Sequence, residues 1–170
     1  QAGIEYNNFA KIKISGINTV GVDSSSSTEY SYQFNTKIQQ VLAGIKLLTT
    51  SKEYFHPYGE AGLGIAFNRT GDYLTSTTNT GSLNFTPEFV GGNDMKISFI
   101  LGLGLDANIY EHIRVGLGYR YSYFNTAALG NGYVNLGGSS SSTSQIPVSF
   151  NPEASHLYAN QLLGHITYIA

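Results

Sequence analysis

The sequence contains neither cysteine nor tryptophan, and it is poor in charged residues. A chain without cysteine forms no disulfide bonds, so cysteine usage does not indicate its compartment. Charged residues make up 12% of the chain, against about 25% in an ordinary soluble domain. This number of charged residues is too small for the surface of a soluble domain of this size. The net charge of −2, without any basic run, gives no electrostatic case for nucleic acid as a partner.

Long hydrophobic runs are also missing. No stretch approaches the roughly 18 consecutive apolar residues that a membrane-spanning helix needs. Apolar residues nevertheless make up 41% of the chain, so any membrane-facing surface must be interleaved with polar positions. The 170 residues are enough for one domain and few for two, so we expect residues 1–170 to form a single domain.

Alternation of apolar and polar residues is the main pattern that is present. It runs through residues 3–15, 58–68, 96–106 and 113–123, and less regularly through 156–170. Runs of about ten residues match the length of a tilted strand that crosses a bilayer. The apolar face is predicted to meet lipid at Leu63, Ile65, Phe67, Phe99, Leu101, Leu103, Val115 and Leu117. The opposite face is predicted to line a lumen with a structural charge network of Lys11, Lys13, Lys46, Glu60, Lys96, Asp106, Arg114 and Arg120.

The segment 29–48 changes its hydrophobic phase. Tyr30, Tyr32 and Phe34 share one phase, whereas Val41 and the apolar residues that follow occupy the other. A β-bulge inserts one residue and re-aims a strand, so we predict a bulge near Gln39 and Gln40.

Connections between these segments alternate in length. Long polar stretches cover 20–28, 70–94 and 125–155, while the turns within 49–57 and 108–112 are short. This asymmetry is typical of bacterial outer-membrane barrels. A soluble β-sandwich or a lipocalin-like barrel is the alternative, but charges directed into its interior would be costly unless paired. We therefore predict an all-β, antiparallel, up-and-down transmembrane β-barrel with about six membrane-length strands in this chain.

Three motifs support a family resemblance. Residues 57–64 (PYGEAGLG) resemble the start of a rising strand in small outer-membrane barrels, and residues 102–105 with 113–121 (GLGL and IRVGLGYRY) resemble their penultimate hairpin. Residues 157–168 (LYANQLLGHITY) are similar to their closing strand. From about Gln39 onward the chain thus resembles the opacity-protein and OmpA-like barrel family.

The resemblance implies a barrel of eight strands. Compared with that pattern, the chain lacks an N-terminal hairpin before Gln1, and Ala170 stands where family members usually end in an aromatic residue. We expect the sequence to cover the greater part of such a barrel.

Catalytic and binding chemistry finds little support in the sequence. His56, His112, His156 and His165 do not share metal-ligand spacing, so no metal and no cofactor is predicted. His156 with Ser155 and Glu153 could form the site of an outer-rim lipid-modifying hydrolase, but adjacent strand residues point to opposite faces. A narrow porin-like channel is a second alternative, although an eight-stranded lumen is filled by its own side chains.

The expected function is therefore that of a non-enzymatic, multi-pass protein of the outer membrane of a Gram-negative bacterium. Its barrel would anchor three long loops at the cell surface in contact with lipid or lipopolysaccharide. Family resemblance implies that loops 20–28, 70–94 and 125–155 serve as an adhesin, in host contact or in envelope integrity.

Overall fold

The computed structural model describes residues 1–20, 28–49, 54–77, 87–136, 144–148 and 150–168, which contain β-strands and no helix. This confirms an all-β chain. The strands are β1 (Ala2–Asn8), β2 (Ile12–Val20), β3 (Thr28–Leu48), β4 (Phe55–Thr77), β5 (Pro87–Phe89), β6 (Asn93–Tyr110), β7 (Ile113–Ala128), β8 (Gly132–Leu136), β9 (Ser144–Val148) and β10 (Glu153–Tyr168). The serine runs 24–27 and 139–142 of the predicted loops, and Ala170, lie outside the described residues.

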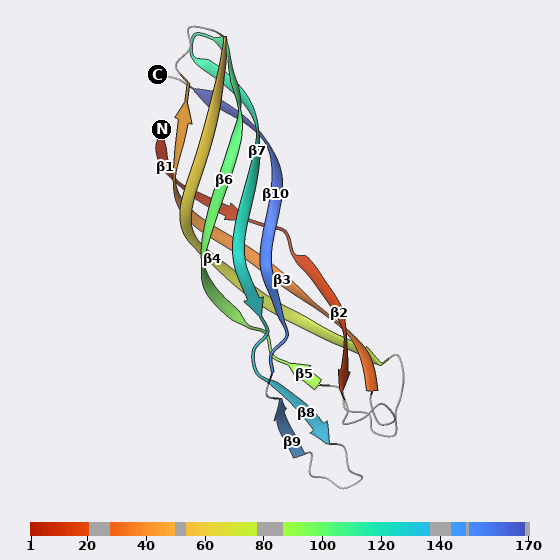
Figure 1. Cartoon of the computed structure of the whole chain (residues 1–170). Coiled ribbons are helices and arrows are strands. Elements are labelled where there is room, and N and C mark those ends of the chain that lie inside the picture. The colour runs from red at the N-terminus through yellow and green to blue at the C-terminus, as the bar shows by residue number, and fades with distance from the viewer. Residues whose placement is uncertain (21–27, 50–53, 78–86, 137–143, 149, 169–170) are drawn as a thin grey trace.

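One antiparallel sheet contains all the long strands. Its order is β1–β3–β4–β6–β7–β10, and β2 also pairs with β3. Successive long strands are therefore neighbours, as an up-and-down topology requires. Several strands extend into the predicted loops: β4 reaches Thr77 and β6 begins at Asn93, both within 70–94. The other described parts of these loops add β5, β8 and β9, which form a separate sheet at the end of the molecule where β2, β3 and β4 meet (Figure 1).

A β-bulge separates β1 from β2. Asn8 is the register partner of Gln39, whereas Ile12 is the partner of Thr36. The first strand thus has one residue more than β3 in this interval, and the extra residue exchanges its two faces. The sequence placed Ile12 on the outer face, but its side chain packs against a buried cluster. The alternation predicted over 3–15 is therefore wrong from Lys11 onward.

By contrast, β3 keeps one phase along its length, with its even-numbered residues turned inward. The bulge predicted at Gln39 and Gln40 is not found, because their partners Phe67 and Ala66 continue the β3–β4 ladder without a shift. The ladder shifts instead beside Asp72, whose φ is 54°. What changes along β3 is the interior that it faces: aromatic near the loops and partly charged near the short turns.

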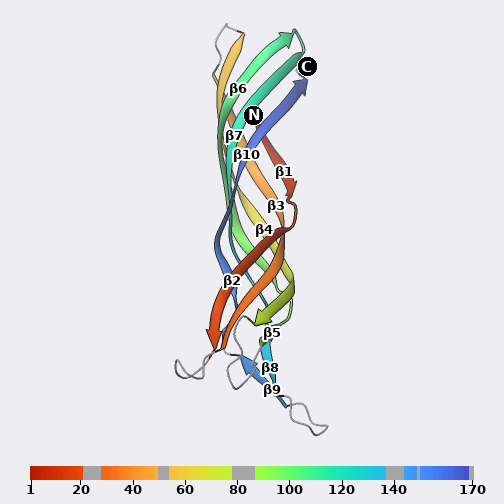
Figure 2. The same cartoon turned by 90° about the vertical axis from the view of Figure 1, so that its right-hand side faces the viewer.

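The long sheet curls strongly into an elongated trough, with β1 and β2 along one edge and β10 along the other (Figures 1 and 2). The curl brings β7 across to the first edge. There the rings of Phe9 and Phe124 meet with centroids 4.6 Å apart. Among the described residues no ladder joins β10 to β1 or β2. The predicted closed barrel is therefore not formed by these residues.

Close packing accompanies the curl at glycines that face inward. A Cβ atom at Gly64 would lie 1.9 Å from the carbonyl oxygen of Val41 and 2.7 Å from the Cα atom of Leu42. Gly59 lies on the same strand but faces outward, and a Cβ atom there would meet nothing within 4 Å. The two glycines form a matched pair for testing the curl.

We expect Gly64→Ala to lower the free energy of unfolding by about 1–3 kcal/mol, because the added methyl group overpacks the inner side of the sheet. Gly59→Ala should change it by less than about 0.5 kcal/mol. Heat unfolding followed by far-ultraviolet circular dichroism checks both variants. Equal stability of the two would contradict the close approach of β3 to β4.

Candidate functional site

The outward side chains are apolar over the half of the sheet that lies near the short turns. Leu63 on β4 is 63% exposed, whereas the inward Ala66 is fully buried. Neighbouring strands continue this surface, since Ala43, Leu63 and Phe99 are successive register partners. We call this surface the apolar belt. Its members are Val41, Ala43, Ile45, Leu47, Phe55, Ala61, Leu63, Ile65, Phe67, Met95, Ile97, Phe99, Leu101, Leu103, Leu105, Val115, Leu117, Leu162 and Ile166.

The belt has a defined height. On β4 it extends from Phe55 to Phe67, which at about 3.3 Å per residue is about 40 Å along the strand. A tilt of about 35–45° would reduce this to about 28–33 Å. That height equals the roughly 30 Å hydrocarbon thickness of a bilayer.

Exposed aromatic rings lie at both ends of the belt. They are Tyr54, Phe55, Tyr110 and Tyr168 near the short turns, and Tyr6, Phe67 and Tyr158 toward the loops. Aromatic girdles of this kind mark the two interfaces of membrane barrels.

Charged side chains occupy the interior behind the belt. Arg120 on β7 donates hydrogen bonds through Nε and Nη2 to Glu60 on β4, at 2.7 and 3.1 Å. Its Nη1 donates to the carboxylate of Glu5 on β1. Bidentate, charge-assisted contacts of this kind are strong and directional. One guanidinium group thus ties together three strands, including one edge of the sheet.

A second charged group lies nearer the short turns. The Lys46 ammonium contacts Asp106 at 2.9 Å and Nε2 of His165 at 3.0 Å, and it lies 3.7 Å from the ring centroid of Tyr58. His165 also contacts the buried Asp106 at 3.0 Å. The ring of Tyr58 fits over Gly104, where a side chain would collide with it. Glycine therefore provides the space for large interior side chains.

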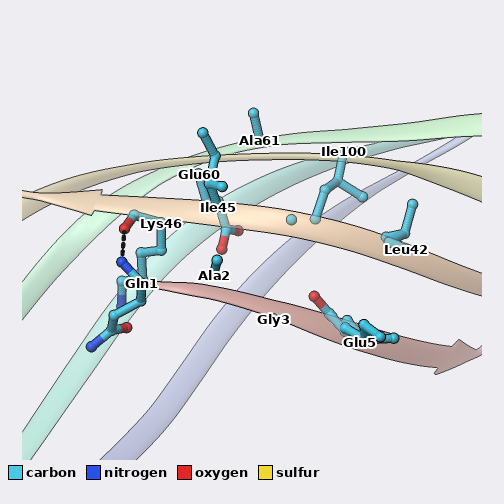
Figure 3. A pocket seen from close by; sticks show the side chains of 12 residues that line it. Gln1, Ala2, Gly3, Glu5, Leu42, Ile45, Lys46, Glu60, Ala61 and Ile100 are labelled. Carbon is cyan, nitrogen blue, oxygen red and sulfur yellow. Dashed lines mark hydrogen bonds between the residues drawn. The ribbon is translucent and has the colours of Figure 1, made fainter.

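A cavity of about 330 Å³ opens beside β1 (Figure 3). Glu5, Lys46 and Glu60 are its charged lining residues, and Leu42 and Ile100 add apolar surface. Each of these charges already has a partner within the protein. The cavity therefore offers a small solute no unengaged charged group among its described lining residues.

The polarity of the two faces reverses toward the loop end. There the interior holds buried Phe34, Phe89 and Leu129, and the rings of Tyr32 and Tyr73 pack against them. Burial raises the pKa of the Tyr73 phenol. The outward side chains of this region are mostly polar and include Lys13, Ser15, Asn35 and Ser76. The buried cluster of Ile38, Ala66 and Phe124 lies between the two regions.

Four of the predicted lumen residues form ion pairs in the interior: Lys46 with Asp106, and Arg120 with Glu60. Arg114 is half-buried near the turn, where its Nε donates to Asn108 at 2.9 Å; Lys96 is also half-buried.

Lys11 and Lys13 do not belong to the interior set. Both are exposed on the outer face. The bulge between β1 and β2 exchanges the faces before these residues, which is why the alternation placed them wrongly. Conversely, Glu5 and His165 join the interior groups, although the predicted charge network did not include them. Their position opposite the apolar face in the alternation was the signal that could have identified them.

The residues predicted to face lipid all lie on the outer face of the sheet. Leu63, Ile65, Phe67, Leu101, Leu103 and Leu117 are exposed, and Phe99 and Val115 are half-buried beside their neighbours.

The histidine at the loop end does not assemble with Ser155 and Glu153 into a catalytic group. His156 has a φ of 57° at a register shift of β10, and its ring faces Tyr123, with Nδ1 3.3 Å from the phenol oxygen. Within the described residues, no three His, Asp or Glu side chains are grouped to hold a metal ion. No helix in the same residues is long and apolar enough to cross a membrane.

Comparison with known proteins adds no family assignment: no family model, curated protein or solved structure matches the chain. Inference about function therefore depends on the arrangement of the residues themselves.

We expect Arg120→Met to lower the free energy of unfolding by about 3 kcal/mol, because it leaves Glu60 and Glu5 without their shared cation. Lys11→Met removes an exposed ion pair with Asp72 and should cost less than about 1 kcal/mol. Urea unfolding measures both. If Arg120→Met matches Lys11→Met, the interior network does not stabilise the sheet. Adding Glu60→Met to Arg120→Met should recover part of the loss.

Proposed function

We propose that this protein is a transmembrane β-barrel of a bacterial outer membrane. Its barrel would anchor the loop-end structure at the cell surface. The observation that carries the proposal is the reversal of polarity along the same strands. Around the belt the outer face is apolar and the interior charged, whereas at the loop end the interior is apolar and the outer face mostly polar.

Water as the only solvent would leave this arrangement unexplained. Large exposed apolar patches usually mark an interaction surface, and the belt extends over five strands, from β3 to β10. A bilayer solvates such a belt, while paired charges and glycines fill the narrow interior. The aromatic rings at both ends of the belt support the same environment.

The free edges of β1 and β10 bear on how the sheet would sit in lipid. Hydrocarbon satisfies no backbone hydrogen bond, so spanning sheets must close. The proposal therefore includes two further strands between β10 and β1, which would give the closed barrel eight strands. An added antiparallel hairpin keeps the alternation of strand directions that β10 and β1 present.

An anchoring role fits the interior better than a channel. The interior contains the Arg120 group near its middle, and Phe124 and Phe34 are buried nearer the loops. Such side chains fill an eight-stranded lumen rather than leave an open path. The loop end carries β5, β8 and β9, whose sheet presents the described surface for adhesion, host contact or envelope integrity. We propose no catalytic activity.

Tryptophan replacements test the orientation in a bilayer without background, since the chain has no tryptophan. Phe67 points outward. Phe124 is buried at the same level of the sheet, where it packs against Ala66, the residue that precedes Phe67. In vesicles that contain brominated lipid chains, we expect strong fluorescence quenching for Phe67→Trp and weak quenching for Phe124→Trp. Weak quenching of both would contradict membrane insertion, and equal strong quenching would contradict the assignment of faces.

A charged side chain should destabilise the protein when it is placed on the belt, but not when it is placed on the outer face beyond the belt. Leu101 is the register partner of Ala61, half-way along the belt, whereas Ser15 is exposed beyond it. We expect Leu101→Arg to reduce the stability of the vesicle-folded protein by about 2–4 kcal/mol, and Ser15→Arg to have almost no effect. Urea titration of the fraction folded in vesicles checks this. A similar effect of both variants would mean that the belt does not face hydrocarbon.

A further inference from the structure

Four of the nine lysine and arginine residues gather on one outer surface, just beyond the apolar belt. They are Lys11, Lys13, Lys37 and Arg69, on or next to the adjacent strands β2, β3 and β4. All four are exposed. We call this group the basic patch.

Like charges in the patch are held side by side. Lys37 and Arg69 are direct register partners across β3 and β4, an arrangement that destabilises a sheet. Asp72 is the carboxylate beside them, and it already contacts Lys11 at 3.1 Å and accepts a hydrogen bond from Asn35 at 3.1 Å. The amide of Asn35 and the ammonium of Lys11 hold the pKa of Asp72 below its ordinary value.

The remaining cations of the patch lack a counter-charge. Within the part of the chain that the structure describes, no ion pair or side-chain hydrogen bond engages Lys13, Lys37 or Arg69. Three neighbouring positive groups are thus available to an external anion.

The level of the patch indicates the source of that anion. Arg69 lies two residues beyond Phe67, the last belt residue on β4, which is about 7 Å along the strand. The headgroup layer of a bilayer is about 5–8 Å thick on each side of the hydrocarbon. If the belt occupies the hydrocarbon, the patch lies among the headgroups on the loop side.

We propose that the basic patch binds the phosphate of a membrane lipid and prefers a phosphomonoester headgroup. This inference rests on the proposed function. A phosphomonoester carries about −1.5 to −2 charges, enough to balance most of the charge of the adjacent Lys37 and Arg69. The guanidinium of Arg69 presents a planar fork that matches phosphate oxygens, and Lys37 adds a point charge beside it.

Attachment to a lipid is part of the recognition. The patch is an open surface, so a free anion there would remain largely hydrated. A lipid adds contact between its acyl chains and the exposed Phe67 and Met95, which are register partners directly below Arg69 and its partner Asn93. Phosphate and acyl chain would thus be bound by consecutive rows of the same strands.

The test uses Phe67→Trp as a reporter beside the patch in phosphatidylcholine vesicles. A small fraction of the lipid is brominated. In one sample it is phosphatidic acid, which has a phosphomonoester headgroup, and in the other it is phosphatidylcholine. Quenching by brominated phosphatidylcholine tests insertion and hence the proposed function. The ratio of the two quenching efficiencies tests the patch alone. We expect at least an approximately fivefold preference for phosphatidic acid, because each surface cation contributes about this factor at an anionic membrane.

Variants of the patch provide the controls. Lys37→Gln with Arg69→Gln should abolish the preference, Lys37→Arg with Arg69→Lys should retain most of it, and Arg114→Gln, near the opposite turn, should retain all of it. Insertion without a preference, or a preference that survives Lys37→Gln with Arg69→Gln, would overturn the site while leaving the proposed function intact. Reversal of the preference by millimolar inorganic phosphate would show a site for free phosphate and overturn the assignment to lipid.

Discussion

The guanidinium group of Arg120 lies between two carboxylates that come from other strands, and the curl of the sheet depends on that contact. Glu60 belongs to β4 and Glu5 to β1, on the far side of the trough. A flatter sheet would leave Arg120 without Glu5 and place a charge in a half-filled interior, which is expensive. Gly102, between β4 and β7, leaves the space that the Glu60 side chain occupies. Charge pairing and small residues therefore determine the cross-section together.

This interior explains the unusual distribution of apolar residues. Once the inner face around Arg120 is polar, the apolar half of each alternating strand must lie outside. The situation reverses where the strands pass Ile38, Ala66 and Phe124 toward the loops. Beyond that level Phe34, Phe89 and Leu129 form a buried apolar core, against which side chains from β2, β3, β4, β9 and β10 pack. The same strands thus have an apolar outer face near the short turns and a mostly polar one at the loop end, where the ladders of β3 with β4 and of β7 with β10 also shift register.

Sequence alone was sufficient for the strands in which alternation is regular. On β4, β6 and β7 it identified both the strands and the outward residues, because a period of two leaves one assignment of faces once one residue is placed. It failed at Lys11 and Lys13 because a single extra residue in β1–β2 leaves no compositional trace. The bulge predicted in β3 was wrong for the opposite reason: hydrophobicity changed sides while the strand did not. The partners of Arg120 are 60 and 115 residues away, and such pairs follow only from the curl.

The bulge between β1 and β2 also affects how the edge strand tolerates changes in length. In a regular strand, removing one residue turns every later side chain to the opposite face. Here the surplus residue lies between β1, whose even-numbered side chains point outward, and β2, whose odd-numbered side chains do. Loss of Ala10 would leave Lys11 opposite Lys37 in a continuous ladder, and Ile12 and Ile14 would keep their inward direction. At this position the edge strand can therefore lose one residue without turning any later side chain to the other face.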